Sequence, residues 1–190
     1  MDREWRTLET ELRRENVSLV RFVGYLGVPL AYRQDVLQEA MISAWRNRGS
    51  YEGLGPVRAW LFAIVRRQAL QFLRRKNRGF LRNGMPADAA AGGIFEVEDG
   101  SRALDVAAAD RDAVGSAVAA LPIDLREAVV LAFVVGMPLA EVAQVQGVPL
   151  GTVKSRLHTA RQRLKAALAD TYPERASARG YVGRLPDGAG

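Results

Sequence analysis

Side chains suited to binding DNA are concentrated between Gly151 and Leu168, a stretch without a carboxylate. At 100° per residue, one stripe of a helix here is apolar and consists of Val153, Leu157, Ala160, Leu164 and Leu168. The opposite face carries Lys154, Ser155 and His158, which can reach base edges from the first turns of a recognition helix. Arg156 and Arg161 lie on the flanks, where guanidinium groups can hold phosphates. The pattern predicts duplex binding, but a solvated basic face has the same composition, and His158 can equally be an exposed histidine without a task.

A second basic stretch runs from Arg66 to Arg82, with seven basic residues and no acid. As a helix it has a packed face of Phe62, Val65, Ala69, Phe72 and Leu73. The opposite side would present Trp60, Ile64, Arg67, Gln71, Arg74, Arg75 and Arg78, and we expect Arg66 to contact nucleic acid as well. An aromatic residue at the head of a basic stripe suits single-stranded nucleic acid, because cations track the phosphates while an unstacked base rests on a ring. The alternative for Trp60 is a structural residue wedged between helices.

A third polar face lies on the preceding segment, opposite Leu37, Ala40, Met41 and Ala44. It consists of Asp35, Gln38, Glu39, Ile42 and Arg46, within an arc of about 100°. An apolar residue ringed by hydrogen-bonding groups suits docking on a partner helix, and plain solvated surface is an equal alternative. We expect Trp45 to lie in the core.

Helices must position these three faces, because helical periodicity dominates and no alternating run suggests a sheet. We predict helices over 5–26, 32–47 and 56–78, with Gly27 and Pro29 ending the first and a loop at 49–55. A short helix over 138–146, a turn at Gly147 and a longer helix over 150–168 match the spacing of a helix-turn-helix. The expected fold class is all-α.

A composition change divides the chain. Between Ala87 and Ala120 seven acids stand against two arginines. We therefore predict two small helical domains, 1–82 and 112–170, joined by an acidic flexible linker, 83–111, and a disordered tail, 171–190.

Composition excludes several classes of protein. The chain has no cysteine and one histidine, so disulfides, thiolate chemistry and a zinc site are not expected. A formal net charge of +6 favours polyanionic partners. No apolar stretch reaches the ~20 residues of a membrane helix, and we expect a cytoplasmic protein. Neither a phosphate loop nor a nucleophile motif is present, so we expect no enzyme and no cofactor.

Two sets of motifs resemble a known family. The sequences D-V-L-Q-E-A-M-I-S-A-W (35–45) and R-A-W-L-F-A-I-V-R-R (58–67) resemble region 2 of extracytoplasmic-function (ECF) sigma factors of RNA polymerase. The sequences L-P-I-D-L-R-E-A-V-V-L (121–131) and G-V-P-L-G-T-V-K-S-R-L-H-T-A-R (147–161) resemble region 4. Both sets stand in the family's order with the family's gap between them.

The resemblance implies partners and roles. Asp35, Gln38 and Glu39 would dock on the β′ clamp helices of core RNA polymerase. The helix carrying Trp60 and Arg67 would recognise the −10 promoter element and hold its non-template strand open. Thr152, Lys154, Ser155, Arg156 and His158 would read the −35 element as duplex, beside a contact with the polymerase β flap. The acidic linker would thread toward the RNA exit channel, and an anti-sigma factor would hold the protein inactive.

The chain departs from the family pattern at two positions of the −10 helix. Members of the family often carry asparagine where this chain has Arg67, and aspartate where it has Gln71. We therefore expect unusual promoter preference or melting. The alternative function is a conventional helix-turn-helix regulator that binds duplex operators as a dimer, which would leave the first domain unexplained.

Overall fold

The computed structural model describes residues 2–51, 56–82 and 108–169, and every regular element in those ranges is helical. The expected all-α fold class is therefore confirmed. The predicted tail, part of the predicted 49–55 loop, and residues 83–107 of the predicted linker lie outside the described residues. Among the helices that are described, none is long and apolar enough to cross a membrane.

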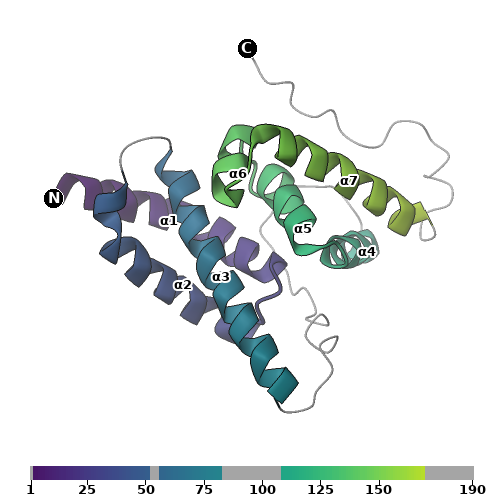
Figure 1. The fold of residues 1–190 in the computed structure, drawn as a ribbon, viewed down its shortest axis with the longest axis horizontal. Coiled ribbons are helices and arrows are strands. Elements are labelled where there is room, and N and C mark those ends of the chain that lie inside the picture. Colours follow the sequence, from purple (N-terminus) through teal and green to yellow (C-terminus); the bar gives the residue numbers. More distant parts are fainter. Residues whose placement is uncertain (1, 52–55, 83–107, 170–190) are drawn as a thin grey trace.

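Three helices form the first domain: α1 (Asp2–Tyr25), α2 (Leu30–Arg46) and α3 (Val57–Arg82), with a short 3-10 turn, η1 (Arg48–Ser50), after α2. Figure 1 shows α1 and α2 packed on α3. Gly27 adopts a φ of 97° after α1, and Pro29 caps α2, as the predicted break requires. The apolar stripes meet in a core centred on Leu19, Phe22 and Phe62, whose two rings lie 5.5 Å apart.

Trp45 is a correction to the sequence prediction. Its side chain is 45% exposed, whereas the adjacent Ala44 is buried. One residue is a turn of 100° around the helix, so Trp45 lies beside the buried stripe of α2 and not on it. The Arg48 guanidinium lies 4.2 Å from the centre of the indole ring, and this cation–π contact covers part of the exposed face.

The second domain contains α4 (Ala108–Ala119), α5 (Ile123–Val129), the π-helical turn η3 (Val130–Val134), α6 (Leu139–Gln146) and α7 (Leu150–Ala169). The predicted linker is corrected at its end, because residues 108–111 already belong to α4. Alanine-rich sequence with an early aspartate favours a helix start there. The helix-turn-helix prediction is confirmed: Gly147 ends α6 in the left-handed conformation, with φ 65° and ψ 38°.

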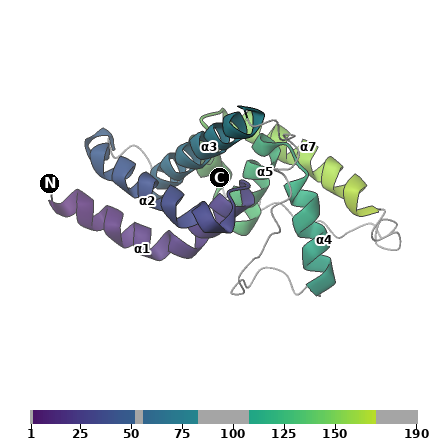
Figure 2. The same cartoon turned by 90° about the horizontal axis from the view of Figure 1, so that it is seen from below.

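The two domains lie against each other. The α3 helix of the first domain packs on α6 of the second, and α1 contacts η3 (Figures 1 and 2). Buried apolar residues of both domains form one continuous cluster. Because α6 is the first helix of the helix-turn-helix, α3 and that motif share this interface.

Gly147 allows a test of the turn. Gly147→Ala should lower the free energy of unfolding by about 1 to 2 kcal/mol, because a Cβ is unfavourable in the left-handed region even where space is free. Gly151 is the matched control, since it lies in the first turn of α7, has no positive φ and also has open space around it. Gly151→Ala should leave stability unchanged or raise it by at most about 1 kcal/mol. Urea unfolding followed by circular dichroism measures both, and equal effects would contradict the turn geometry.

Candidate nucleic-acid and polymerase interfaces

The predicted duplex-reading helix is α7, and its faces divide as the periodicity predicts. Val153, Leu157 and Ala160 are buried against the rest of the domain. Thr152 is half-buried, and the predicted contacts on the opposite side are exposed, namely Lys154, Ser155, His158 and Arg161. No acidic residue occurs in α7 to repel phosphate. The helix therefore presents a basic and hydroxyl-bearing surface, which is the chemistry used for contacts to phosphates and base edges.

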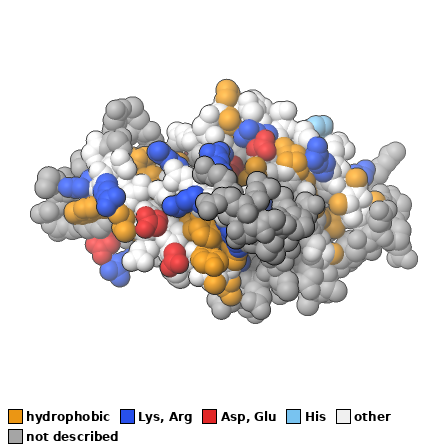
Figure 3. Space-filling model, turned by 60° about the horizontal axis from the view of Figure 1, so that its bottom comes forward, with side chains coloured by type: hydrophobic (Ala, Val, Ile, Leu, Met, Phe, Trp, Pro, Cys, Tyr) orange, Lys and Arg blue, Asp and Glu red, His pale blue; other side chains and the backbone are white. Residues whose placement is uncertain are grey.

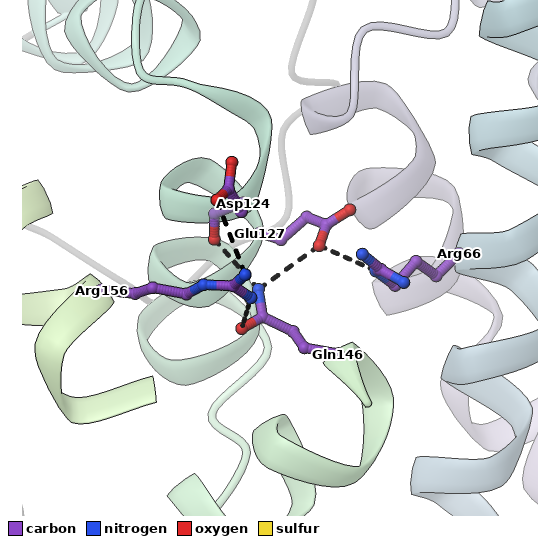
Figure 4. Close-up of polar contacts among 5 residues, drawn as sticks. All are labelled: Arg66, Asp124, Glu127, Gln146 and Arg156. Carbon is purple, nitrogen blue, oxygen red and sulfur yellow. Dashed lines mark hydrogen bonds and ion pairs between the residues drawn. The ribbon is translucent and has the colours of Figure 1, made fainter. Parts of the chain in front are cut away.

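Arg156 lies differently from the other predicted duplex contacts. Its Nη1 donates to Gln146 Oε1 at 3.0 Å, and its Nη2 lies 3.6 Å from Asp124 Oδ2. In this arrangement the guanidinium ties α7 back to α5 and α6 (Figure 4). Its role as a DNA contact stays a prediction.

The predicted single-strand surface on α3 is largely open. Arg67, Gln71, Arg74 and Arg75 are exposed on this helix. Trp60 is half-buried against the core, with its ring 5.7 Å from that of Tyr51. Arg78 belongs to α3, but its side chain lies outside the described residues. Figure 3 shows lysine and arginine side chains on both domains, with aspartate and glutamate side chains among them.

Arg66 does not join that open surface. Its Nε donates to Oε2 of Glu127, on α5 of the second domain, at 2.8 Å. The side chain of Arg66 is 25% exposed, whereas that of Glu127 is fully buried. The structure therefore separates Arg66 from the other predicted −10 contacts and places it at the interface between the domains.

Glu127 is a site residue that the sequence analysis missed. Besides Arg66, it accepts a hydrogen bond from Gln146 Nε2 at 3.3 Å, and the same nitrogen donates to the Asp124 carbonyl at 3.0 Å. Burial raises the pKa of the Glu127 carboxyl above its ordinary value of 4.5, and the positive charge of Arg66 opposes that shift. The stretch from Leu121 to Leu131 contains Asp124 and Arg126 besides Glu127, so its sequence did not single out Glu127 as the buried charge. Its partner, 61 positions away, gave no signal in the sequence.

Two further arginines cross the interface. Arg58 of α3 donates to the Val135 carbonyl at 2.8 Å, and its Nε lies 3.1 Å from Glu15 of its own domain. Arg126 of α5 donates to the Tyr25 carbonyl, at the end of α1, at 3.4 Å and to the Leu121 carbonyl at 2.9 Å. Burial lowers the pKa of Arg126 from its ordinary value. The carbonyl ends of α1 and η3 thus receive positive charge, which the helix dipole favours.

The predicted docking face lies on α2. Asp35, Gln38, Glu39, Ile42 and Arg46 are all exposed there, while Val36, Leu37, Ala40 and Ala44 face the core. Exposed Trp45 extends the apolar part of this side of the helix. Within the part of the chain that the structure describes, no cluster of His, Asp or Glu could hold a metal ion.

Comparison with known proteins gives the family. The family description "Sigma-70 region 2" matches residues 12–79, and "Sigma-70, region 4" matches residues 111–164. RNA polymerase sigma factor CnrH of Cupriavidus metallidurans is 30% identical over 158 residues, which is 82% of this chain and 83% of that protein. ECF RNA polymerase sigma factor SigM of Mycobacterium tuberculosis is 36% identical over 156 residues, 82% of this chain and 74% of that protein. The chain belongs to the ECF sigma factors of the sigma-70 family.

Two solved structures have a similar fold. Sigma factor RpoE in complex with the anti-sigma factor NepR, from Bartonella quintana, gives a TM-score of 0.65 at 26% identity, over 84% of this chain and 95% of that one. CnrH in complex with the cytosolic domain of CnrY gives 0.61 at 25% identity, over 87% and 90% of the two chains. Both similar structures are complexes of a sigma factor with another protein, which in the first is an anti-sigma factor.

The raised pKa of Glu127 predicts a pH effect. Because the folded chain binds this proton more tightly than the unfolded chain, the free energy of unfolding should rise, relative to Glu127→Gln, as pH falls from neutral toward 4.5. Urea unfolding at several pH values measures the difference. Glu9→Gln is the control, because Glu9 forms only an exposed pair with Arg13 at 2.9 Å. If the wild type instead loses stability relative to Glu127→Gln on acidification, the attraction of Arg66 outweighs the cost of burial.

Proposed function

We propose that this chain binds core RNA polymerase and directs it to promoters with particular −10 and −35 elements. The observation that carries the proposal is the presence of three separate exposed faces of distinct chemistry in a chain of this family. These are the mixed face of α2, the basic stripe of α3 and the hydroxyl-bearing basic face of α7.

Each domain then has its own task. The first, 1–82, would dock on the β′ clamp helices through Asp35, Gln38, Glu39, Ile42 and Arg46. Its α3 would hold the opened −10 strand with Trp60 and the basic residues Arg66, Arg67, Arg74, Arg75 and Arg78, beside Gln71. The second, 112–170, would read −35 duplex through Thr152, Lys154, Ser155, Arg156, His158 and Arg161, and contact the β flap. Bond formation belongs to the polymerase, and we assign no catalytic residue to this chain.

Regulation by an anti-sigma factor is part of the proposal. A sigma factor of similar fold, RpoE, is in complex with the anti-sigma factor NepR, and CnrH is in complex with the cytosolic domain of CnrY. We infer that a comparable partner withholds this chain from polymerase in the cytoplasm until a signal releases it.

Reconstitution with core RNA polymerase tests the function. The chain should bind core tightly, direct initiation, and bind free duplex DNA only weakly. Asp35→Ala combined with Gln38→Ala should weaken core binding, since both side chains are exposed on α2. Asn16→Ala, exposed on α1, is the control and should bind core normally. A chain that ignores core polymerase but shifts duplex DNA as a dimer would be a conventional helix-turn-helix regulator.

Substitutions on α7 test the assignment of roles within that helix. Lys154→Ala and His158→Ala should each relax −35 sequence preference, at a cost of about 1 to 3 kcal/mol per lost base contact. Arg161→Ala should weaken binding to all sequences alike and reduce the slope of log K against log salt by about 0.9. Holoenzyme binding to a panel of −35 variants at several salt concentrations separates the two effects. Uniform weakening by all three substitutions would reject base reading by Lys154 and His158.

A further inference from the structure

The ion pair between Arg66 and Glu127 joins one of the proposed −10 contacts to the other domain. Its two atoms are 2.8 Å apart, and the carboxylate is fully buried (Figure 4). We propose that Glu127 is an internal competitor of promoter DNA: it holds Arg66 and keeps the free chain closed, and phosphates of the opened strand take Arg66 when the domains separate. The inference deepens the proposed function, because it rests on Arg66 being a −10 contact.

The chemistry of the pair allows this exchange. A guanidinium binds carboxylate and phosphate through the same kind of charge-assisted hydrogen bond, so one Nε cannot serve both anions at once. The pair is also poised to open. Only one oxygen of Glu127 bonds to Arg66, and the buried Oε1 has no hydrogen-bond partner among the described residues. Desolvation offsets part of the attraction in such an incomplete pair, so the pair holds the domains together weakly enough for phosphate to displace the carboxylate.

The second domain keeps partners for the carboxylate after Arg66 leaves. Gln146 Nε2 lies 3.3 Å from Glu127 Oε2, and Gln146 Oε1 accepts from Arg156 of α7. The same network orients Arg156 on the recognition helix (Figure 4). Loss of Arg66 therefore leaves Glu127 hydrogen-bonded within its own domain. The free energy of opening is lower than it would be if the carboxylate lost all its hydrogen bonds.

Dimensions require that the domains separate before both promoter elements are read. Elements near −10 and −35 are about 25 base pairs apart, which is about 85 Å of duplex at 3.4 Å per pair. A compact chain of this length has a radius of gyration of about 16 Å, hence a diameter near 40 Å. Segment 83–107 can span at most about 85 Å when extended. The closed arrangement is therefore a state of the free chain, and the covalent connection is long enough for the open one.

One distance between the domains, measured in several variants, and one binding assay test the proposal on the full chain. Because the chain has no cysteine, Asn16→Cys and Gln162→Cys, both exposed, place one spin label on each domain. Glu127→Gln and Arg66→Gln should each lengthen and broaden the distance between the labels. Arg67→Gln is the matched control, because it removes an exposed arginine of the same helix and should leave the distance unchanged.

Binding to single-stranded DNA then distinguishes the loss of the carboxylate, in Glu127→Gln, from the loss of the cation, in Arg66→Gln. The probe is a mixed-sequence oligonucleotide of about 12 nucleotides, a length in the range that one binding surface covers. Glu127→Gln frees Arg66 and should lower Kd about threefold to tenfold, because a larger fraction of the chain is competent to bind. Arg66→Gln opens the chain equally but removes the cation, so its Kd should not fall.

Each contrary result has a distinct meaning. Unchanged distances in both variants would overturn the latch, whatever the chain does with polymerase. Opening without tighter binding by Glu127→Gln would overturn the competition and remove Arg66 from the −10 contacts, while core reconstitution still reports on sigma function. Arg66→Gln leaves the second domain's residues intact, so the distance test stands even if Glu127→Gln fails to fold.

Discussion

The carboxylate of Glu127 lies where helices of both domains meet, and its burial requires that these helices supply its hydrogen-bonding partners. A charge without access to water needs cationic or hydrogen-bonding partners. Here they come from three other helices: Arg66 on α3, Gln146 on α6 and, through Gln146, Arg156 on α7. The position of α3 beside the helix-turn-helix follows from this network together with the apolar cluster that crosses the interface.

The same arrangement leaves the remaining recognition surfaces open. The α2 face, most of the α3 stripe and the polar side of α7 are exposed. A closed free chain can therefore meet polymerase through α2 while one arginine of its DNA surface is still engaged by Glu127. If α2 is the docking face as proposed, binding to core and release of Arg66 are separable events.

Local features were predictable from the sequence because they depend on neighbouring residues. Apolar residues at three- and four-residue steps predicted the buried stripe of α7, and Gly147 predicted the turn before it. The prediction that Trp45 lies in the core was wrong because neighbouring residues differ by 100° around a helix, which is enough to move a side chain from the buried stripe to the surface. The cation–π contact with Arg48 covers part of the exposed indole ring. The start of α4 at Ala108 was not predicted, because the acidic composition around it indicated a linker.

The pairing of residues that are far apart in the chain could not be predicted from the sequence. Periodicity places Arg66 beside the packed stripe of α3 and Arg67 on the open side, but it gives no indication that the partner of Arg66 is Glu127. That pairing arises from the docking of two domains, which periodicity cannot report. For the same reason Arg58 and Arg126, which hold carbonyls across the interface, drew no attention as sequence features.

The distance between the two domains, measured in the free chain and again in the chain bound to core RNA polymerase, tests the central claim most directly. Spin labels on α1 and α7 should report one short, narrow distance in the free chain and a much longer one in the holoenzyme. A long distance already present in the free chain, or a short one that persists on polymerase, would contradict the account.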